Sequence, residues 1–208
     1  MRAKVKVCGL TRISDALLAS DLGASAVGFV FWEKSPRYVD PDQAAAIVAR
    51  LPPDVAPVGV FVDASPAWLN EVADHVGLSA IQLHGDEPPE SFGALPRRVI
   101  KAVPLRGPAD VAAASGLPEA VTPLIDAHDP VKRGGTGRTV DWAMAATLAR
   151  QRRVFLAGGL SPSNVGGAVR AVRPYAIDVS SGVETSPGVK SPELLHAFFE
   201  AVFGIDAA

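Results

Sequence analysis

Short apolar runs rich in Val, Ile and Phe alternate along the whole chain with Ala- and Leu-rich segments of helical periodicity. The runs show little polar alternation, which is typical of strands buried on both faces of a parallel sheet. The pattern predicts eight strands, at Lys4–Val7, Ala26–Phe31, Val58–Val62, Ala80–Leu83, Val99–Val103, Thr122–Ile125, Val154–Leu156 and Ala176–Val179.

The segments between these strands carry chemical signals for helix starts. Asp40-Pro41-Asp42-Gln43 places an N-cap, a proline at the first helical position and a glutamine at the third. Similar pairs recur because the N–H that proline lacks would be unpaired at a helix start anyway. These further predicted starts are Ser65-Pro66, Gly107-Pro108, Ser161-Pro162 and Ser191-Pro192.

The spacing of the predicted elements indicates the architecture. One strand recurs roughly every 26 residues, close to the shortest length that holds a strand, two loops and a crossover helix. Eight such units in 208 residues predict an α/β protein with a single (β/α)8 barrel domain over residues 1–208. An open doubly wound sheet is the alternative, but it usually carries a GxGxxG turn after its first strand. Here that turn reads Cys8-Gly9-Leu10-Thr11, which favours the barrel.

Charge and composition exclude several classes of protein. The chain has 20 Lys+Arg, 22 Asp+Glu and a formal net charge of −2, without the basic cluster that a nucleic-acid partner requires. A single cysteine and four scattered histidines predict neither a disulfide scaffold nor a metal site. The first ten residues do not form a signal peptide, and no apolar run is long enough to span a membrane. We therefore expect a cytoplasmic protein.

In a (β/α)8 barrel the reacting groups lie at the carboxyl ends of the strands. Cys8 ends the first predicted strand, with Lys6 two residues earlier on the same side. The thiol is either a reacting group or a small buried hydrophobe. Asp126 ends the sixth strand, where partial burial would raise its pKa and suit it to donate a proton. A helix cap or an ion pair with Lys132 or Arg133 is the alternative.

Other polar residues follow the predicted strands. Arg37 can hold a carboxylate through forked hydrogen bonds, although an ordinary surface arginine would look the same. His84 and Asp178, at the ends of the fourth and eighth strands, are candidates for substrate contact. Gly158-Gly159 and Ser181-Gly182 follow the last two strands, where small residues let a phosphate approach backbone N–H groups.

A further glycine-rich stretch lies in the long loop after Asp126. Gly134-Gly135-Thr136-Gly137 lacks the ending of a nucleotide-binding P-loop, so we interpret it as a mobile lid or a flexible turn.

Taken together, these segments resemble the phosphoribosylanthranilate isomerase family of tryptophan biosynthesis, in the family's order and over nearly the whole chain. Two departures are Val140, where the family usually has Phe, and Ser191, where Asp is usual. The matching segments are Lys6–Thr11, Ser35–Val39, Gln82–Glu87, Gly134–Gly137 with Asp141-Trp142, Leu156–Leu160 with Asn164-Val165, and Asp178–Glu184 with Pro187–Lys190.

The resemblance implies an Amadori rearrangement of N-(5′-phosphoribosyl)anthranilate to 1-(2-carboxyphenylamino)-1-deoxyribulose 5-phosphate, without a cofactor. It implies Asp126 as the acid, Cys8 as the base and Arg37 as the contact for the anthranilate carboxylate. Both pKa values would then have to move toward 7, upward for the carboxyl and downward for the thiol. The implied phosphate site is the backbone around Gly158-Gly159 and Ser181-Gly182.

The expected partner is a small phosphorylated sugar–anthranilate substrate, and we expect a monomer or homodimer. Two other hypotheses stay open at this point. One is a different sugar-phosphate barrel enzyme, such as the histidine-pathway aminoaldose isomerase or a metal-dependent pentose-phosphate epimerase. The other is a phosphate-binding module without catalysis.

Overall fold

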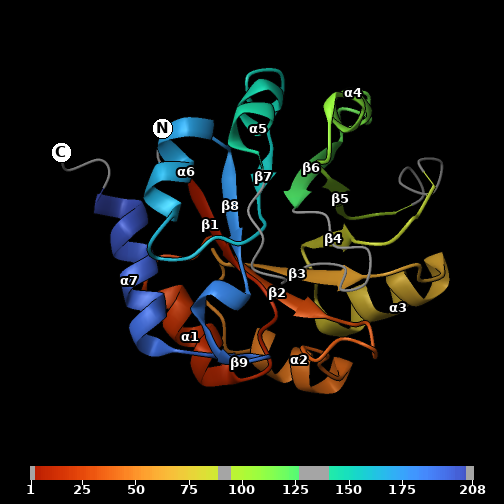
Figure 1. Ribbon diagram of the computed structural model, residues 1–208. Helices are drawn as coiled ribbons and strands as arrows, with labels where there is room; N and C mark the ends of the chain where they lie inside the picture. Colours follow the sequence, from red (N-terminus) through yellow and green to blue (C-terminus); the bar gives the residue numbers. More distant parts are fainter. Residues whose placement is uncertain (1–2, 89–94, 127–140, 205–208) are drawn as a thin grey trace.

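The computed structural model describes residues 3–88, 95–126 and 141–204. Eight parallel strands form a closed barrel in the order β1 to β8, with helices packed around the outside (Figure 1). The predicted barrel is thereby confirmed, and the open doubly wound sheet is wrong. The strands are β1 (Lys4–Val7), β2 (Ala26–Val30), β3 (Ala56–Phe61), β4 (Ala80–Leu83), β5 (Arg98–Pro104), β6 (Val121–Asp126), β7 (Phe155–Leu156) and β8 (Ala176–Val179).

All eight predicted strands are present. Three of them, β1, β4 and β8, have the predicted ends, and the ends of the other five differ by one or two residues. The first strand closes the barrel because it pairs with β2 on one side and with β8 on the other. In this register Lys6 lies opposite Asp178 of β8. The register thus places two charged residues side by side in the barrel wall.

Helices connect the strands on the outer side. They are α1 (Ile13–Asp21), α2 (Pro41–Val48), α3 (Pro66–Val76), α4 (Pro108–Ser115), α5 (Trp142–Ala149), α6 (Val165–Val172) and α7 (Pro192–Phe203). The connection between β4 and β5 is described only at residues 84–88 and 95–97, which hold no helix.

Four of the five predicted helix starts are confirmed, with proline in the first turn of α2, α3, α4 and α7. The start at Ser161-Pro162 is wrong, because α6 begins at Val165 after the N-cap Asn164. The Asn164 side chain accepts a hydrogen bond from the Ser161 N–H at 2.9 Å and donates to the Gly159 carbonyl at 2.8 Å. This local pairing holds the preceding residues in a turn.

Two apolar clusters follow from the alternation of side chains along each strand. Val5 and Val7 belong to the large cluster between the barrel and its helices. A smaller cluster combines Val58, Ile100 and Leu124 with several alanines, such as Ala26. Lys6 points to the opposite side from Val5 and Val7, as the two-residue period of a strand requires. It is nevertheless fully buried.

The chain adds a short hairpin after β8 that the sequence pattern did not indicate. A 3-10 helix, η2 (Ser181–Val183), leads into β9 (Glu184–Ser186), which pairs antiparallel with β10 (Val189–Lys190). Gly188 turns the hairpin with φ of 82°. The hairpin brings Lys190 back beside Glu184.

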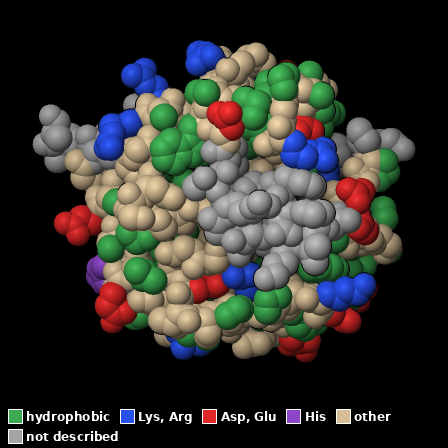
Figure 2. All heavy atoms as spheres, viewed as in Figure 1, with side chains coloured by type: hydrophobic (Ala, Val, Ile, Leu, Met, Phe, Trp, Pro, Cys, Tyr) green, Lys and Arg blue, Asp and Glu red, His purple; other side chains and the backbone are tan. Residues whose placement is uncertain are grey.

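The surface charge and the helix lengths concern two classes of protein that the sequence disfavours, nucleic-acid-binding and membrane-spanning proteins. On the part of the face that Figure 2 shows in colour, Lys and Arg side chains are interspersed with Asp and Glu and form no single basic patch. Among the described residues, no helix is long and apolar enough to cross a membrane.

Candidate active site

Four predicted site residues lie at the carboxyl ends of four strands. Cys8 directly follows β1, His84 directly follows β4, Asp126 is the last residue of β6 and Asp178 is the penultimate residue of β8. Because the strands are parallel and form one barrel, these ends meet at the same mouth. Cys8, Asp126 and Asp178 are each only 8% exposed, so each is largely desolvated at this mouth.

Cys8 is held in a tight environment on β1 and β2. Its backbone N–H donates to the Val179 carbonyl at 2.8 Å. A Cβ atom added to Gly28 of β2 would lie 2.8 Å from the Cys8 sulfur and 3.0 Å from the Lys6 ammonium nitrogen. The first distance is shorter than real Cβ contacts and the second is tighter than most of them, so a side chain at position 28 would displace the thiol or the ammonium group.

The environment of Cys8 shifts its pKa in the direction opposite to the one required by the sequence-based mechanism. Burial raises the pKa of the Cys8 thiol above its ordinary value, and the carboxylate of Asp178 adds to this rise. The charges of Lys6 and Lys190 lower it but do not compensate for burial. The expected fall of this pKa toward 7 is therefore wrong, because desolvation disfavours the thiolate.

Lys6 and Asp178 form a buried ion pair below the mouth, with 2.9 Å between Nζ and Oδ1. Burial lowers the pKa of Lys6, but Asp178 and Cys8 more than offset this, so the pKa is raised and the ammonium stays charged. Burial also raises the pKa of Asp178, on which the charges of Asp126 and His84 act too. The ion pair therefore connects the surroundings of Cys8 electrostatically with those of Asp126.

His84 and Asp126 face each other, with 3.3 Å between Nε2 and Oδ2. The other ring nitrogen of His84, Nδ1, lies 3.1 Å from the Gln82 amide nitrogen. Gln82 is 1% exposed, and its amide oxygen is buried without a hydrogen-bond partner among the described residues. The imidazole is thus fixed between an amide and a carboxylate, which sets its orientation toward Asp126.

The loop after His84 is fixed by a second buried ion pair. Lys101 of β5 donates to Glu87 at 2.8 Å and to the Gly85 carbonyl at 2.6 Å. Glu87 also accepts hydrogen bonds from the backbone N–H groups of Gly85 and Asp63. The stretch Gln82–Glu87 therefore combines a side chain at the mouth with the groups that hold its loop.

Arg37 lies across the turn that follows Cys8. A Cβ atom on Gly9, whose φ is 73°, would lie 2.6 Å from Cδ of Arg37. The guanidinium donates from Nε and Nη2 to both carboxylate oxygens of Glu184, at 2.8 to 3.2 Å. Arg37 is therefore an oriented side chain and not the loose surface arginine that the sequence left open.

The two predicted phosphate loops are adjacent. Gly158 and Gly159 have φ values of 82° and 65°, in the left-handed region that favours glycine. Gly182 in η2 lies directly against the Leu160 carbonyl, which a Cβ atom at position 182 would overlap. The backbone segments that follow β7 and β8 are therefore in direct contact at Gly182 and Leu160.

Several sequence-based expectations lie outside the described residues. These are the lid at Gly134-Gly135-Thr136-Gly137, Val140, and the ion pair of Asp126 with Lys132 or Arg133.

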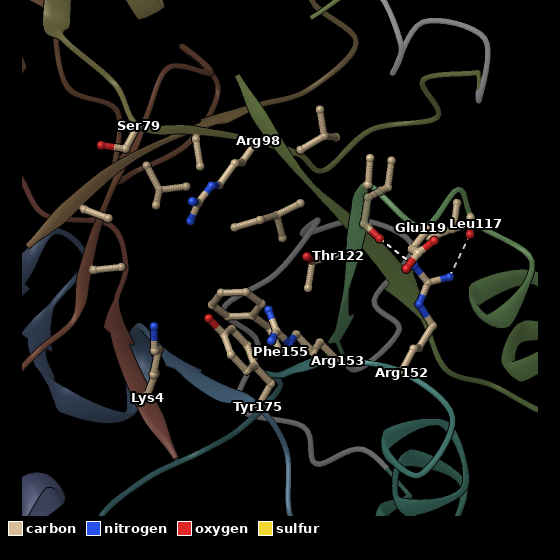
Figure 3. A pocket seen from close by; sticks show the side chains of 18 of the residues that line it. Lys4, Ser79, Arg98, Leu117, Glu119, Thr122, Arg152, Arg153, Phe155 and Tyr175 are labelled. Atoms are coloured by element: carbon tan, nitrogen blue, oxygen red, sulfur yellow. Dashed lines mark hydrogen bonds between the residues drawn. The ribbon is translucent and has the colours of Figure 1, made fainter. Parts of the chain in front are cut away.

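A cavity of about 1010 Å³ lies at the other end of the barrel (Figure 3). It is lined by residues at the amino ends of strands and their preceding loops, including Lys4, Arg98, Thr122 and Tyr175. None of the predicted site residues is among the described residues that line it. This end of a barrel serves stability, so the cavity is separate from the candidate active site.

The sequence interpretation missed two charged residues at the mouth. Glu184 pairs with Arg37, and Lys190, which is fully buried on the hairpin, donates to Glu184 at 2.7 Å and to the Cys8 carbonyl at 2.6 Å. The available signal was the segment Asp178–Glu184 with Pro187–Lys190, which the sequence analysis matched without assigning a role to either charge.

Comparison with known proteins gives consistent results. The family model described as N-(5'phosphoribosyl)anthranilate (PRA) isomerase matches residues 5–201. N-(5'-phosphoribosyl)anthranilate isomerase of Geobacter sp. (strain M21) is 51% identical over 197 residues, covering 94% of this chain and 95% of the relative. The protein of the same name from Myxococcus xanthus is 46% identical, covering 99% of each chain.

Solved structures agree in fold. The phosphoribosyl anthranilate isomerase from Thermotoga maritima superposes with a TM-score of 0.91 at 41% identity, covering 97% of this chain and 99% of its own. A structure of such an isomerase in complex with reduced 1-(o-carboxyphenylamino)-1-deoxyribulose 5-phosphate has a TM-score of 0.88 at 40% identity, with the same coverage.

Proposed function

Because the chain belongs to the N-(5'-phosphoribosyl)anthranilate isomerase family and catalyses that family's isomerisation in tryptophan biosynthesis, we propose that Cys8 is its base and Asp126 its acid. One observation carries this assignment. The thiol and the carboxyl end β1 and β6 at the same mouth, both nearly buried, and the Lys6–Asp178 pair lies in electrostatic contact with both. A sugar bound there can meet one group on each side.

The proposed reaction has two proton transfers before the product forms. Asp126 gives a proton to the furanose ring oxygen, so the C1′–O bond breaks and the ring opens to a Schiff base. The thiolate of Cys8 then removes the proton from C2′, and the electron pair moves into the iminium to give an enolamine. The enolamine tautomerises to the ketone. Because the substrate's own iminium accepts these electrons, the proposed steps need no metal or organic cofactor.

The raised pKa of Cys8 has a consequence for the second step. A raised pKa keeps this group mostly as the thiol near neutral pH, so the reactive thiolate is a minor form. A thiolate formed at a higher pKa is a stronger base, which favours removal of a proton from carbon. Lys6 and Lys190, whose charges favour the thiolate, keep this form accessible.

We propose Arg37 as the contact for the anthranilate carboxylate. Glu184 accepts hydrogen bonds from the edge of the guanidinium that is formed by Nε and Nη2. The edge formed by Nη1 and the second hydrogen of Nη2 makes no hydrogen bond to another described residue. A second carboxylate can therefore bind there through two parallel hydrogen bonds.

The remaining predicted residues have roles around the sugar phosphate. We propose that the backbone of Gly158-Gly159 and Ser181-Gly182 binds the phosphate, where the two loops meet. His84, whose ring is held toward Asp126, contacts the ribose near its ring oxygen. Asp178, paired with Lys6, contacts the sugar close to Cys8.

We further propose the setting in which the enzyme works. Every group assigned here comes from one chain, so a monomer or a homodimer would carry complete sites. Residues 1–208 would form a single barrel domain. The expected compartment is the cytoplasm, where the small phosphorylated substrate is the only partner required by this reaction.

The assignment is tested by following the loss of anthranilate fluorescence with Cys8→Ser and Asp126→Asn. Both changes conserve shape and remove one proton-transfer group, so each should lower kcat/KM by about 10²- to 10⁴-fold. Asp74→Asn, at an exposed carboxylate on α3 whose side chain is 71% exposed, is the matched control and should keep parental turnover. Parental kcat/KM in either site variant would remove that residue from the mechanism.

A further inference from the structure

We propose that Glu184 is the positioning residue of this site, which orients Arg37 toward the substrate carboxylate and, through Lys190, fixes the backbone of Cys8. The proposal rests on the function proposed above, because it takes Arg37 and Cys8 as the groups that meet the substrate. It assigns a role to a buried charged network that the two-step reaction does not itself use.

The first half of the network is the pair of Arg37 and Glu184. The side chains are only 14% and 4% exposed, and the carboxylate bonds both Nε and Nη2. Forked pairing of this kind fixes the plane of the guanidinium as well as its position. The remaining edge of Arg37 therefore has a set direction before any substrate arrives.

The second half is Lys190, whose side chain is fully buried. Its ammonium group has three protons and three acceptors, namely the Cys8 carbonyl at 2.6 Å, Glu184 Oε1 at 2.7 Å and the Ser180 carbonyl at 3.2 Å. The cation thus bonds the residue that carries the thiol and the strand end of β8. Glu184 is the group shared by Lys190 and Arg37.

The hairpin explains how Glu184 can hold both cations. Lys190 pairs with Glu184 in the β9–β10 register, so the two side chains start from neighbouring positions. Glu184 also accepts the Gly188 backbone N–H at 3.2 Å, and Thr11 donates its hydroxyl to the Gly188 carbonyl at 2.7 Å. These bonds attach the hairpin tip to the turn after β1.

The charge balance of the network indicates its ligand. Burial raises the pKa of Glu184, but Arg37 and Lys190 more than offset this, so the pKa is lowered and the carboxylate is ionised. Burial lowers the pKa of Lys190, while Glu184 opposes the fall. Two cations around one carboxylate leave one positive charge, and a bound carboxylate would neutralise the set. A charge that stays buried without a partner is costly, so the extra positive charge favours an anionic group on the substrate.

This arrangement predicts separate effects for Arg37 and for Lys190. Arg37 should discriminate a substrate that carries the anthranilate carboxylate from an analogue built on aniline, which lacks it. Lys190 should affect the position and charge state of Cys8 for both substrates alike. The ratio of kcat/KM for the two substrates therefore reports on Arg37 alone.

The test measures that ratio for the parent and for Glu184→Gln, Glu184→Asp and Lys190→Met. Loss of an oriented charge-assisted pair should lower the ratio about 10- to 100-fold in Glu184→Gln, and Glu184→Asp should recover part of it. Lys190→Met should lower kcat for both substrates and leave the ratio unchanged. It should also move the alkylation of Cys8 to higher pH, because Lys190 is one of three charged groups that act on the thiol, the others being Lys6 and Asp178. Glu193→Gln on α7 is the matched control for a glutamate outside the site.

The outcomes are distinct. A ratio that stays parental or rises in Glu184→Gln would mean that Glu184 only neutralises Arg37, and the proposal would be wrong. A Lys190→Met variant that changes the ratio would refute the assigned division between the two cations. If Glu184→Gln does not fold, the milder Glu184→Asp must still lower the ratio. Parental turnover in Cys8→Ser would overturn the proposed base without changing the ratio measured for Glu184.

Discussion

Lys4 and Lys6 stand two residues apart on β1 and point to the same side of the strand, yet they occupy opposite environments. Lys4, at the amino end, is exposed, and its ammonium lies 5.3 Å from the centre of the Tyr175 ring. Lys6, toward the carboxyl end, is fully buried and bonded to Asp178. A buried charge costs free energy unless it is paired. Among the described residues of the barrel wall, buried charges lie at the end where the candidate chemistry lies.

The same contrast holds for the two ends of the barrel. The amino-terminal cavity is lined by Lys4, Arg98, Arg152 and Arg153 together with Glu119 and with small or apolar side chains such as those of Ala26 and Val58. The carboxyl-terminal mouth has three buried charged networks. They are built on Lys6 and Asp178, on Lys101 and Glu87, and on Arg37, Glu184 and Lys190. Substitutions at the first end should therefore change stability alone, whereas those at the second should change activity as well.

The largest effect on stability should come from Lys6→Met, compared with Lys4→Met. Removing Lys6 leaves the Asp178 carboxyl buried without its partner, which should lower the free energy of unfolding by about 3–5 kcal/mol. The exposed Lys4 should contribute within about 0.5 kcal/mol. Urea denaturation of both variants measures the difference. Equal losses would show that the two ends do not differ in how they hold charge.

A smaller loss is expected for Arg152→Leu at the amino-terminal end. The guanidinium donates to five backbone carbonyls, of Ala114, Ser115, Leu117, Pro118 and Val121. Losing these charge-assisted bonds should lower the free energy of unfolding by about 2–3 kcal/mol. The kcat of the folded variant should stay parental. A clear fall in kcat at a temperature where the variant is fully folded would contradict the division between the ends.

Gly28→Ala tests the fit around the thiol. The added methyl would lie within 3.0 Å of both the Cys8 sulfur and the Lys6 nitrogen, so one of them has to move. We expect a loss of about 1–3 kcal/mol in stability, together with a fall in kcat. Gly107→Ala has open space around its new methyl and serves as the control. Parental kcat in Gly28→Ala would show that the exact position of the thiol does not matter.

The smallest expected change is a pH shift in the reactivity of Cys8. It is the only cysteine in the chain, so alkylation by iodoacetamide reports on it alone. The thiolate is the reacting form, and burial raises the pKa, so the alkylation rate should keep rising above about pH 8.5, the midpoint of an ordinary thiol. A rate that is level from pH 7 upward would mean that Lys6 and Lys190 outweigh burial.

The fold was largely predictable from the sequence, and the reason is local. Strands such as Ala80–Leu83 and Ala176–Val179 are short apolar runs, and helix starts such as Ser65-Pro66 are signalled within four residues. The failure at Ser161-Pro162 has a local cause too, because the Asn164 side chain bonds the backbone of Gly159 and Ser161 and holds these residues in a turn before the helix. No such pattern marks the β9–β10 hairpin, which is too short to show a period.

The site was predictable only as a set of positions. Cys8 and Asp126 could be placed because they end strands, but their partners are distant in the chain. Glu184 meets Arg37 across 147 positions, and Lys190 reaches the Cys8 carbonyl across 182. The direction of the Cys8 pKa shift depends on how burial balances against two lysines, which only coordinates provide.

A deuterium isotope effect on turnover assigns each proton-transfer group to its own step most directly. Turnover of substrate deuterated at C2′ is compared with that of the unlabelled compound in Cys8→Ser and Asp126→Asn. With a weakened base, removal of the C2′ proton limits the rate, so Cys8→Ser should show a primary isotope effect on kcat/KM. With a weakened acid, ring opening limits the rate, so Asp126→Asn should show none. An isotope effect in Asp126→Asn and its absence in Cys8→Ser would contradict the assignment of the two residues.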